Sequence, residues 1–190
     1  LRISYRIGSN SGAASPQPAT LYGASIFAGI QGSINQTGAS QGAYNIDSTT
    51  RNKDTVYHLI TIQNPWTQQA GLNKNQLLIQ DMTVAAQGND PSVIYVVKNA
   101  VGLSDHLVFS NLPGQGNGKP TFAQYSTSAV TEDLSKDNVA NVQTLGINSS
   151  AQFDLAKYNL YLAPGETFSV FISSSNAINR TSVGVTWRVD

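Results

Sequence analysis

The sequence predicts an all-β protein, an antiparallel β-sandwich of jelly-roll type with about nine strands. The first observation is a series of short runs that are dense in β-branched and aromatic residues, the composition that strands prefer. The second is the regular placement of Gly, Pro, Asn and Asp between these runs, at the spacing of sandwich turns. The third is the closing region 159–190, where two alternating apolar runs flank a turn rich in Ser and Asn. We interpret these two runs as a closing hairpin of the core.

The first 50 residues differ in composition from the rest of the chain. Leu1–Ile7 alternates apolar with polar residues, which predicts a strand with one polar face. Residues 8–20 are turn formers, and residues 21–42 are rich in Gly, Ala, Ser and Gln, so we expect extended structure with a strand at Ser25–Ile30. We therefore divide the chain into an N-terminal strand and extended arm, 1–50, and a sandwich body, 51–190.

The body begins with strong strand patterns and continues with shorter ones. Thr55–Gln63 is rich in β-branched and aromatic residues and ends at Asn-Pro, and Ser92–Lys98 is an apolar run typical of a central strand. Val130–Val142 is the only segment with a helical pattern, and its weak apolar spacing predicts one turn or none. The remaining predicted strands are Gln76–Ala86, His106–Ser110, Thr121–Ser126, Gln143–Ile147, Gln152–Leu155, Asn159–Leu162, Thr167–Ser173 and Thr181–Val189.

The composition argues against several classes of function. The 190 residues carry 11 basic and 11 acidic side chains, so the net charge gives no attraction to nucleic acid or to an acidic membrane. The absence of Cys excludes disulfides, thiolate catalysis and zinc sites built on sulfur. No apolar run approaches the roughly 20 residues that span a bilayer. Asn and Gln, 17 and 14 residues, outnumber the charged residues and give the surface uncharged hydrogen-bonding groups.

Short motifs that suggest catalysis lack their structural context. Gly38 to Gly42 matches the G-x-S-x-G pattern around Ser40, but no apolar strand precedes it and no helix pattern follows it. The sequence around the two histidines, His58 and His106, gives no sign of a nucleophile or of a group that would orient the imidazole. Asp47, Asp54, Asp90 and Asp105 are oxygen donors for calcium without EF-hand spacing. We therefore expect no enzyme activity, no cofactor and no metal.

Two loop features are candidates for contact with a partner. The Gly-rich loop around Gly114, Gly116, Gly118 and Lys119 resembles a phosphate loop, but Pro120 stands where Ser or Thr is required, so we interpret it as a long surface loop. Trp66 follows Asn-Pro in a loop, where an indole either binds a partner or sugar ring or folds back over the core. Trp187 alternates with valines and is predicted to lie in the core.

The C-terminal third of the chain carries a recognisable pattern, which consists of Leu160, Leu162, Pro164, Gly165, Glu166 and Thr167, the turn Ser173 to Asn176, and Val183, Val185 and Trp187. This pattern resembles that of small virion structural proteins of tailed bacteriophages. The resemblance covers the last third of the chain and the rest only loosely. It implies a β-sandwich that coats or joins a particle and carries over no catalytic residue.

The resemblance leads to two hypotheses of different classes. The first is a non-enzymatic virion protein on the capsid surface or tail, foremost a decoration or cement protein that binds the major capsid protein or neighbouring subunits as a homo-oligomer, for which we expect a trimer. A tail, neck or fibre component belongs to the same class. The second is a receptor- or carbohydrate-binding module that uses Trp66 and the loop 112–120. An arm within residues 1–50 that orders on a neighbouring subunit fits the first hypothesis.

Overall fold

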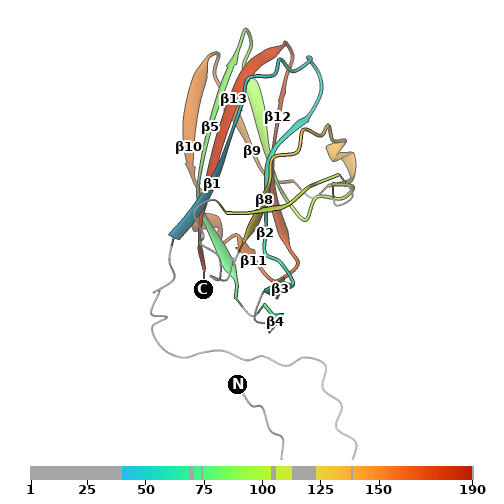
Figure 1. Ribbon diagram of the computed structural model, residues 1–190. Helices are drawn as coiled ribbons and strands as arrows, with labels where there is room; N and C mark the ends of the chain where they lie inside the picture. The colour runs from blue at the N-terminus through green and yellow to red at the C-terminus, as the bar shows by residue number, and fades with distance from the viewer. Residues whose placement is uncertain are drawn as a thin grey trace, which may run out of the picture. The chain divides into compact units, whose positions relative to one another are not determined.

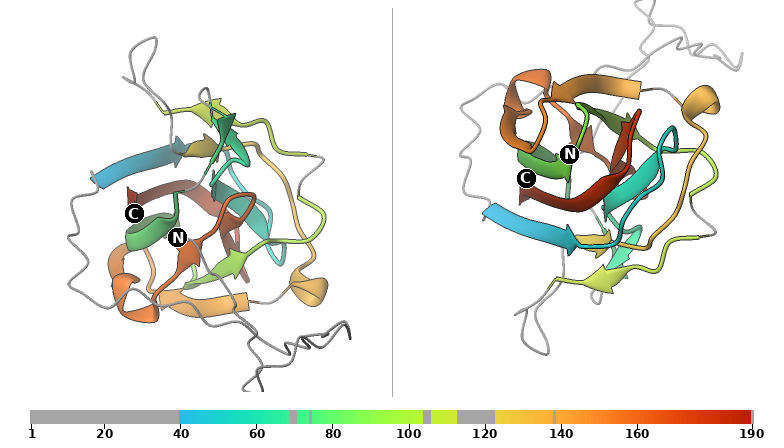
Figure 2. Two further views of the ribbon diagram at one scale, coloured as in Figure 1. Left: turned by 90° about the horizontal axis from the view of Figure 1, so that it is seen from below. Right: turned by 90° about the horizontal axis from the view of Figure 1, so that it is seen from above.

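The protein is a sandwich of two antiparallel β-sheets, and every strand pair among its described residues is antiparallel. The structure is a computed structural model that describes residues 40–68, 71–73, 75–103, 106–112, 123–137 and 139–189. Figure 1 shows the two layers from the side, and Figure 2 shows them along the strands. The predicted all-β, antiparallel sandwich is thus confirmed. The predicted strands Leu1–Ile7 and Ser25–Ile30 lie outside the described residues.

The first sheet, which we call sheet A, has the strand order β1-β13-β5-β10, with β11 pairing the start of β5. The second, sheet B, has the order β7-β8-β2-β12-β6-β9, and β3 and β4 form a separate small hairpin. The strands of sheet A are β1 (Ser40–Asp47), β5 (Leu77–Gly88), β10 (Ser149–Asp154), β11 (Tyr161–Leu162) and β13 (Ile178–Val189). Those of sheet B are β2 (Tyr57–Gln63), β6 (Ser92–Lys98), β7 (Ser110–Asn111), β8 (Gln124–Ser126), β9 (Val139–Leu145) and β12 (Thr167–Ser174), while β3 is Thr67–Gln68 and β4 is Gly71–Leu72.

The main core lies between the sheets, and a smaller one lies on the outer face of sheet B. Alternate side chains of both sheets fill the main core, including Trp187, Phe168 and Met82, all fully buried. On the outer face of sheet B, Phe171 and Val97 pack with Leu103 beneath the segments that follow β6 and β8. Because both of its faces are covered, β12 is buried along nearly its whole length. This explains why β2, β6 and β12 read as nearly continuous apolar runs in the sequence.

The two closing strands do not form a hairpin. β12 is an inner strand of sheet B, between β2 and β6, whereas β13 is an inner strand of sheet A, between β1 and β5. The turn at Ser175–Ala177 therefore carries the chain from one sheet to the other. The prediction of a closing hairpin is wrong because alternation identifies a strand but not the strand with which it pairs. The prediction that Trp187 lies in the core is confirmed, with an exposed fraction of 0%.

The sandwich body begins earlier than residue 51. β1 pairs with β13 at every position from Ser40 to Asp47, and the chain divides into two units between Asn35 and Gln36. The inward positions of β1 include Gln41 and Asn45, whose amides replace the apolar side chains expected in a core strand. Gln41 accepts a hydrogen bond from Trp187 Nε1 (3.2 Å), and Asn45 Nδ2 donates one to the carbonyl of Leu59 (2.8 Å). These two bonds attach β1 to the sandwich, although the composition of β1 does not indicate a core strand.

The bonding of Asn45 depends on an irregularity in β2. The pairing of β2 with β12 shifts by one residue at Leu59, because Val170 pairs with Ile60 and Phe171 with His58. An extra residue of this kind leaves part of its backbone outside the ladder. Asn45 satisfies the carbonyl that the bulge leaves free, since buried backbone groups require a partner.

The weakly patterned middle of the chain is extended rather than helical. Residues 130–142 contain one 3-10 turn, Leu134–Lys136, after which β9 begins at Val139. Asp133 caps this turn by accepting a hydrogen bond from the Ser135 N–H (3.0 Å). The strand predicted at 106–110 shrinks to β7, and a second 3-10 turn, Ala156–Tyr158, precedes β11. No helix among the described residues is long and apolar enough to cross a membrane.

Candidate functional site

A pocket of about 450 Å³, whose described lining residues are all uncharged, opens on the outer face of sheet B. One wall is apolar and comes from the segment that follows β6, while the floor carries amide and hydroxyl groups from β2 and β12. A pocket with an apolar wall and a few polar groups is a typical binding site for a small molecule. Its lining residues are Gln63, Asn99, Ala100, Leu103, Leu107, Phe109, Gly165, Thr167 and Ser169.

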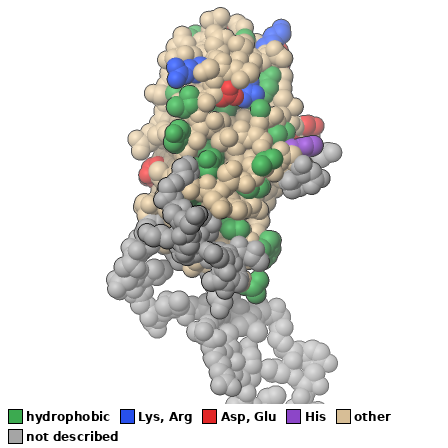
Figure 3. All heavy atoms as spheres, viewed as in Figure 1, with side chains coloured by type: hydrophobic (Ala, Val, Ile, Leu, Met, Phe, Trp, Pro, Cys, Tyr) green, Lys and Arg blue, Asp and Glu red, His purple; other side chains and the backbone are tan. Residues whose placement is uncertain are grey.

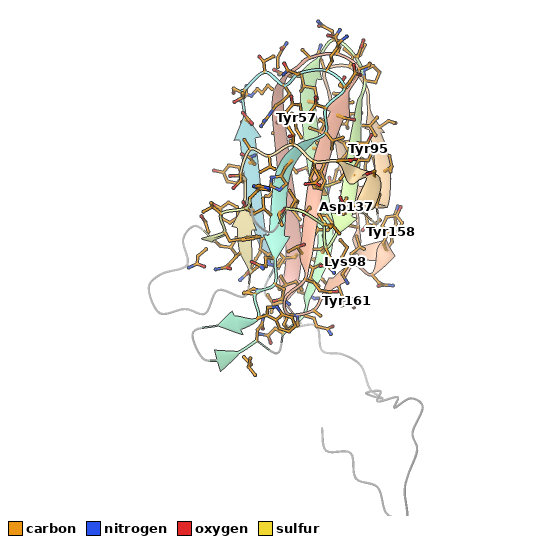
Figure 4. All side chains as sticks on the ribbon, turned by 90° about the vertical axis from the view of Figure 1, so that its right-hand side faces the viewer. Tyr57, Tyr95, Lys98, Asp137, Tyr158 and Tyr161 are labelled. Atoms are coloured by element: carbon orange, nitrogen blue, oxygen red, sulfur yellow. The ribbon has the colours of Figure 1, made fainter. Side chains whose placement is uncertain are left out.

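A corner centred on Glu166 fixes one end of this pocket. The carboxylate pairs with Lys98 Nζ (2.8 Å) and accepts hydrogen bonds from the Ala163 N–H (2.7 Å) and from Asn99 Nδ2 (3.3 Å). Asn99 also accepts a bond from the Thr167 N–H (2.9 Å). Partial burial opposes ionisation, but the bonds from Lys98, Ala163 and Asn99 outweigh it and lower the pKa of the Glu166 carboxyl. Figure 4 places Lys98 toward the end of the sandwich that carries the β3–β4 hairpin.

Trp66 lies against the same corner and remains exposed. Its exposed fraction is 68%, yet its ring occupies the space beside Gly165 that a Cβ would need. The buried Asn64 holds this loop, because its Nδ2 donates to the carbonyls of Leu162 (2.8 Å) and Asn75 (3.0 Å). Trp66 therefore does not cap the core, and it presents an open ring face beside a glycine that lines the pocket.

A buried polar network runs beneath the pocket from His58. Nε2 of His58 bonds Thr61 Oγ1 (2.7 Å), Thr61 Oγ1 bonds Ser169 Oγ (2.8 Å), and Nδ1 of His58 lies 2.8 Å from the carbonyl of Ser128. Residues three apart on a regular strand point to opposite faces, so the bulge at Leu59 is what brings His58 and Thr61 together. The imidazole reaches Ser169 only through Thr61, so this is no direct nucleophile–base pair. It is a satisfied core histidine.

His58 makes the stability of the fold sensitive to mild acid. Burial lowers the pKa of its imidazole from the ordinary 6.5. Below about pH 6.5 the imidazole of the unfolded chain binds a proton, whereas the buried imidazole of the folded protein stays neutral down to its own, lower pKa. The contribution of neutral His58 to the free energy of unfolding is therefore complete above about pH 6.5 and decreases as the pH falls toward the folded-state pKa. The expected slope is at most about 1.4 kcal/mol per pH unit.

Denaturant unfolding between pH 7.5 and pH 5 measures this effect. His58→Gln replaces the titratable imidazole with an uncharged amide, so the unfolding free energy of this variant should depend less on pH. His106→Gln is the matched control because His106 is exposed, and its profile should follow that of the parent. A His58→Gln profile as steep as the parent's would contradict the assignment.

The other residues singled out in the sequence do not assemble into a site. Ser40 begins β1, and its hydroxyl donates to Gln80 Oε1 (3.1 Å) instead of standing on a nucleophile elbow. Asp47 forms an ion pair with Arg51. Among the described residues, no group of three or more His, Asp or Glu side chains is placed to hold a metal ion. Gly114, Gly116, Gly118, Lys119 and Asp105 lie outside the described residues.

A second opening runs along one side of the sandwich, between the edges of the two sheets. This groove, about 480 Å³ in volume, is lined by Gly42 to Ile46 of β1 and by Tyr125 and Thr127 at β8. Both views of Figure 2 show β8 beside β1 here. Charged side chains are few on the face seen in Figure 3, where most of the described surface is uncharged. Tyr44 and Ile46 of β1 are exposed at 70% and 55%.

The described residues thus form an antiparallel β-sandwich with two openings lined by uncharged side chains. Comparisons with protein-family models, with curated proteins and with solved structures gave no match.

The sequence indicated Trp66 but not the residues that surround it. Asn64 and Asn99 stand at the ends of predicted strands, where Asn is an ordinary turn residue, and Leu107 and Phe109 belong to a segment expected to be a strand. The one available signal was the Pro-Gly-Glu corner at Pro164 to Glu166. Its part in a pocket appears only when β2, β6 and β12 meet in one sheet.

Proposed function

We propose that the protein is a non-enzymatic structural subunit of a virus particle, foremost a decoration protein that stabilises the shell through contacts with neighbouring subunits. The order of the strands carries this proposal. In sheet A the order is β1-β13-β5-β10, and in sheet B the corresponding strands follow as β2-β12-β6-β9. The pairs β1 and β2, β5 and β6, β9 and β10, and β12 and β13 each divide between the sheets. We infer jelly-roll connectivity from this alternation, an architecture that viral capsid proteins and lectins share.

The surface chemistry supports an assembly role within that architecture. A fold alone does not define a function. On the outer face of sheet A, Gly184 pairs between Tyr44 and Thr83, and Ser182 pairs between Ile46 and Ala85, so these two rows carry no charge. An uncharged patch of this kind permits a neighbouring subunit to approach without desolvating a charge. The balanced net charge also favours association.

Quantitative mass spectrometry of purified particles of the encoding virus tests the proposal. A decoration protein is expected at a copy number comparable with that of the major shell protein, and a tail, neck or fibre component at a far lower one. Absence from the particles would overturn the proposal. Light scattering on the purified protein tests the expected trimer separately.

A carbohydrate-binding module is the second candidate, and Trp66 is the observation that favours it. Its exposed ring lies beside Gly165, and the adjoining pocket combines Phe109 with uncharged amide and hydroxyl groups. An aromatic face and neutral hydrogen-bonding groups suit the apolar and hydroxyl faces of a sugar. Glycan-array binding that disappears in Trp66→Ala but persists in Tyr158→Ala, a change to an exposed aromatic residue elsewhere, would establish this function. Silence of the parent protein on the array would reject it.

A further inference from the structure

β1 is an edge strand of sheet A among the described residues, and this free edge lacks the features that normally protect the edge of a sheet. Its eight residues pair with β13 in one continuous register without a bulge. Between Ser40 and Ile46 it contains no charged residue and no Pro, and Asp47 at its end is paired with Arg51. Sheet edges usually carry a Lys, a Pro, a bulge or a covering segment, because unpaired backbone groups bind other strands. β9, an edge strand of sheet B, has a register shift opposite Val96 and Val97.

The groove beside β1 exposes this edge to a ligand. Five consecutive residues of β1, Gly42 to Ile46, line it. Successive side chains of a strand point to opposite faces of the sheet, so a surface that contacts every residue in turn follows the backbone edge itself. Tyr125 and Thr127 form the opposite wall, and Tyr125 packs partly against the main core. The groove therefore has the shape and chemistry for an added strand with apolar side chains on one face.

We propose that this groove binds the segment Leu1–Ile7 of a second copy of the chain, which adds a strand to the free edge of β1. The segment alternates Leu1, Ile3, Tyr5 and Ile7 with Arg2, Ser4 and Arg6. Its apolar set faces Ala43 and Tyr125 in the groove, and its arginines face solvent beside the exposed ring of Tyr44. None of the described residues that line the groove is charged, so the apolar set enters it without desolvating a charge there.

The length of the intervening chain favours exchange between copies. Residues 8–39 separate Leu1–Ile7 from β1, and an extended chain of this length spans about 100 Å. A return to the strand's own copy would need only a short turn, and connections longer than about 15 residues are uncommon within a compact domain. A long segment rich in Gly, Ser, Ala and Pro instead suits an arm that reaches a neighbouring subunit. The inference rests on the proposed assembly function and supplies one of its contacts.

Photo-crosslinking of the full chain tests the proposal. Tyr44 is replaced by the photoreactive p-benzoylphenylalanine, and equal amounts of unlabelled and ¹⁵N-labelled protein are mixed in denaturant, refolded together, irradiated and digested. Crosslinks between position 44 and residues 1–7 that join a light to a heavy peptide are expected. Crosslinks of one isotope only would assign the segment to its own copy and overturn the proposal, as would the absence of crosslinks to residues 1–7. The photoreactive group at Tyr158 is the control and should give none to residues 1–7.

Hydrogen exchange supplies an independent measurement. Ile3→Pro removes a backbone donor from the added strand, while Ala14→Pro places the same residue in a segment that already contains Pro16 and Pro18. Ile3→Pro should speed amide exchange in Gly42–Ile46 at least tenfold and lower the sedimentation coefficient, and Ala14→Pro should change neither. Equal exchange in the two variants would count against an added strand. The copy number in particles is measured separately, so the two proposals can be tested apart. If the protein is abundant in particles but gives no mixed crosslink, only the strand exchange is contradicted. If the mixed crosslink forms but the protein is absent from particles, only the particle role is contradicted.

Discussion

Trp187→Ala is expected to lower the free energy of unfolding by about 3–5 kcal/mol, the range for the loss of a large buried aromatic side chain. The indole is fully buried in the main core, and its Nε1 donates to Gln41 Oε1 (3.2 Å). The substitution leaves a cavity between the sheets and removes the bond that attaches the inward face of β1. Because single domains are stable by only about 5–15 kcal/mol, a loss of this size is a large part of the total.

Denaturant unfolding at pH 7.5 measures the loss, with Trp66→Ala as the matched control. Both variants lose one indole, but Trp66 is largely exposed, so its removal should cost less than about 1 kcal/mol. Trp187→Phe retains most of the buried volume and should lose less than the alanine variant, which preserves the comparison if Trp187→Ala does not fold. Equal losses for Trp187→Ala and Trp66→Ala would contradict the assignment of Trp187 to the core.

Gly165→Ala should destabilise the corner beside the pocket by about 1–3 kcal/mol for two separate reasons. The backbone of Gly165 has φ +88°, a conformation that strains any residue with a Cβ. The added Cβ would also overlap the ring of Trp66, so the ring must move. The cost of the backbone strain at position 165 remains even if the Trp66 ring moves, whereas the cost of the overlap exists only while Trp66 is present.

A double-mutant cycle separates these two costs. When Gly165→Ala is combined with Trp66→Ala, the cost of the overlap should disappear while the cost of the backbone strain remains. The two positions should therefore show a measurable coupling energy. Gly146→Ala is the control, because the nearest atom to its Cβ would be Ser149 Oγ at 3.5 Å and its φ is not positive. A coupling energy of zero would show that Trp66 does not lie against Gly165 in solution.

The strands that were predicted well are those whose own side chains determine their environment. β6 matches its prediction residue for residue, and β2, β5 and β12 match theirs closely at the ends. Each is dense in Val, Ile, Leu and Phe because it is buried on one or both faces, so hydrophobic content is visible locally. Trp187 was placed correctly for the same reason, since it alternates with Val183 and Val185 on one face of β13.

The elements that were missed depend on a partner for their burial. β1 has Gln41 and Asn45 at inward positions, and these residues belong in the interior only because Trp187 and the bulge at Leu59 supply hydrogen-bond partners. β9 has one fully buried residue, Leu145, so only its last three residues fell within a predicted strand, Gln143–Ile147, while its first half fell within the segment with a weak helical pattern. Neither error is visible in composition, because the compensating groups lie elsewhere in the chain.

The candidate site follows the same division. The loop position of Trp66 and the Pro-Gly-Glu corner were recognisable from residue type, since an indole in a loop and a Gly after Pro are local signals. Whether Trp66 is exposed or packs over the core was left open by the sequence. The pocket beside Trp66 and this corner was not recognisable, because Gln63 of β2, Asn99 just after β6 and Ser169 of β12 come together only when these strands meet in sheet B.

The order of residue types along the chain is enough to predict an all-β sandwich with an uncharged, amide-rich surface and a core centred on the alternating residues of the C-terminal strands. These properties depend on residue type and on a period of two, both of which are local. The placement of β12 and β13 in different sheets, the membership of β1 in the body and the groove along the edge of β1 follow instead from strand pairing in the folded protein. Strand pairing depends on hydrogen bonds between residues far apart in the chain, and every extended backbone offers the same donors and acceptors for them.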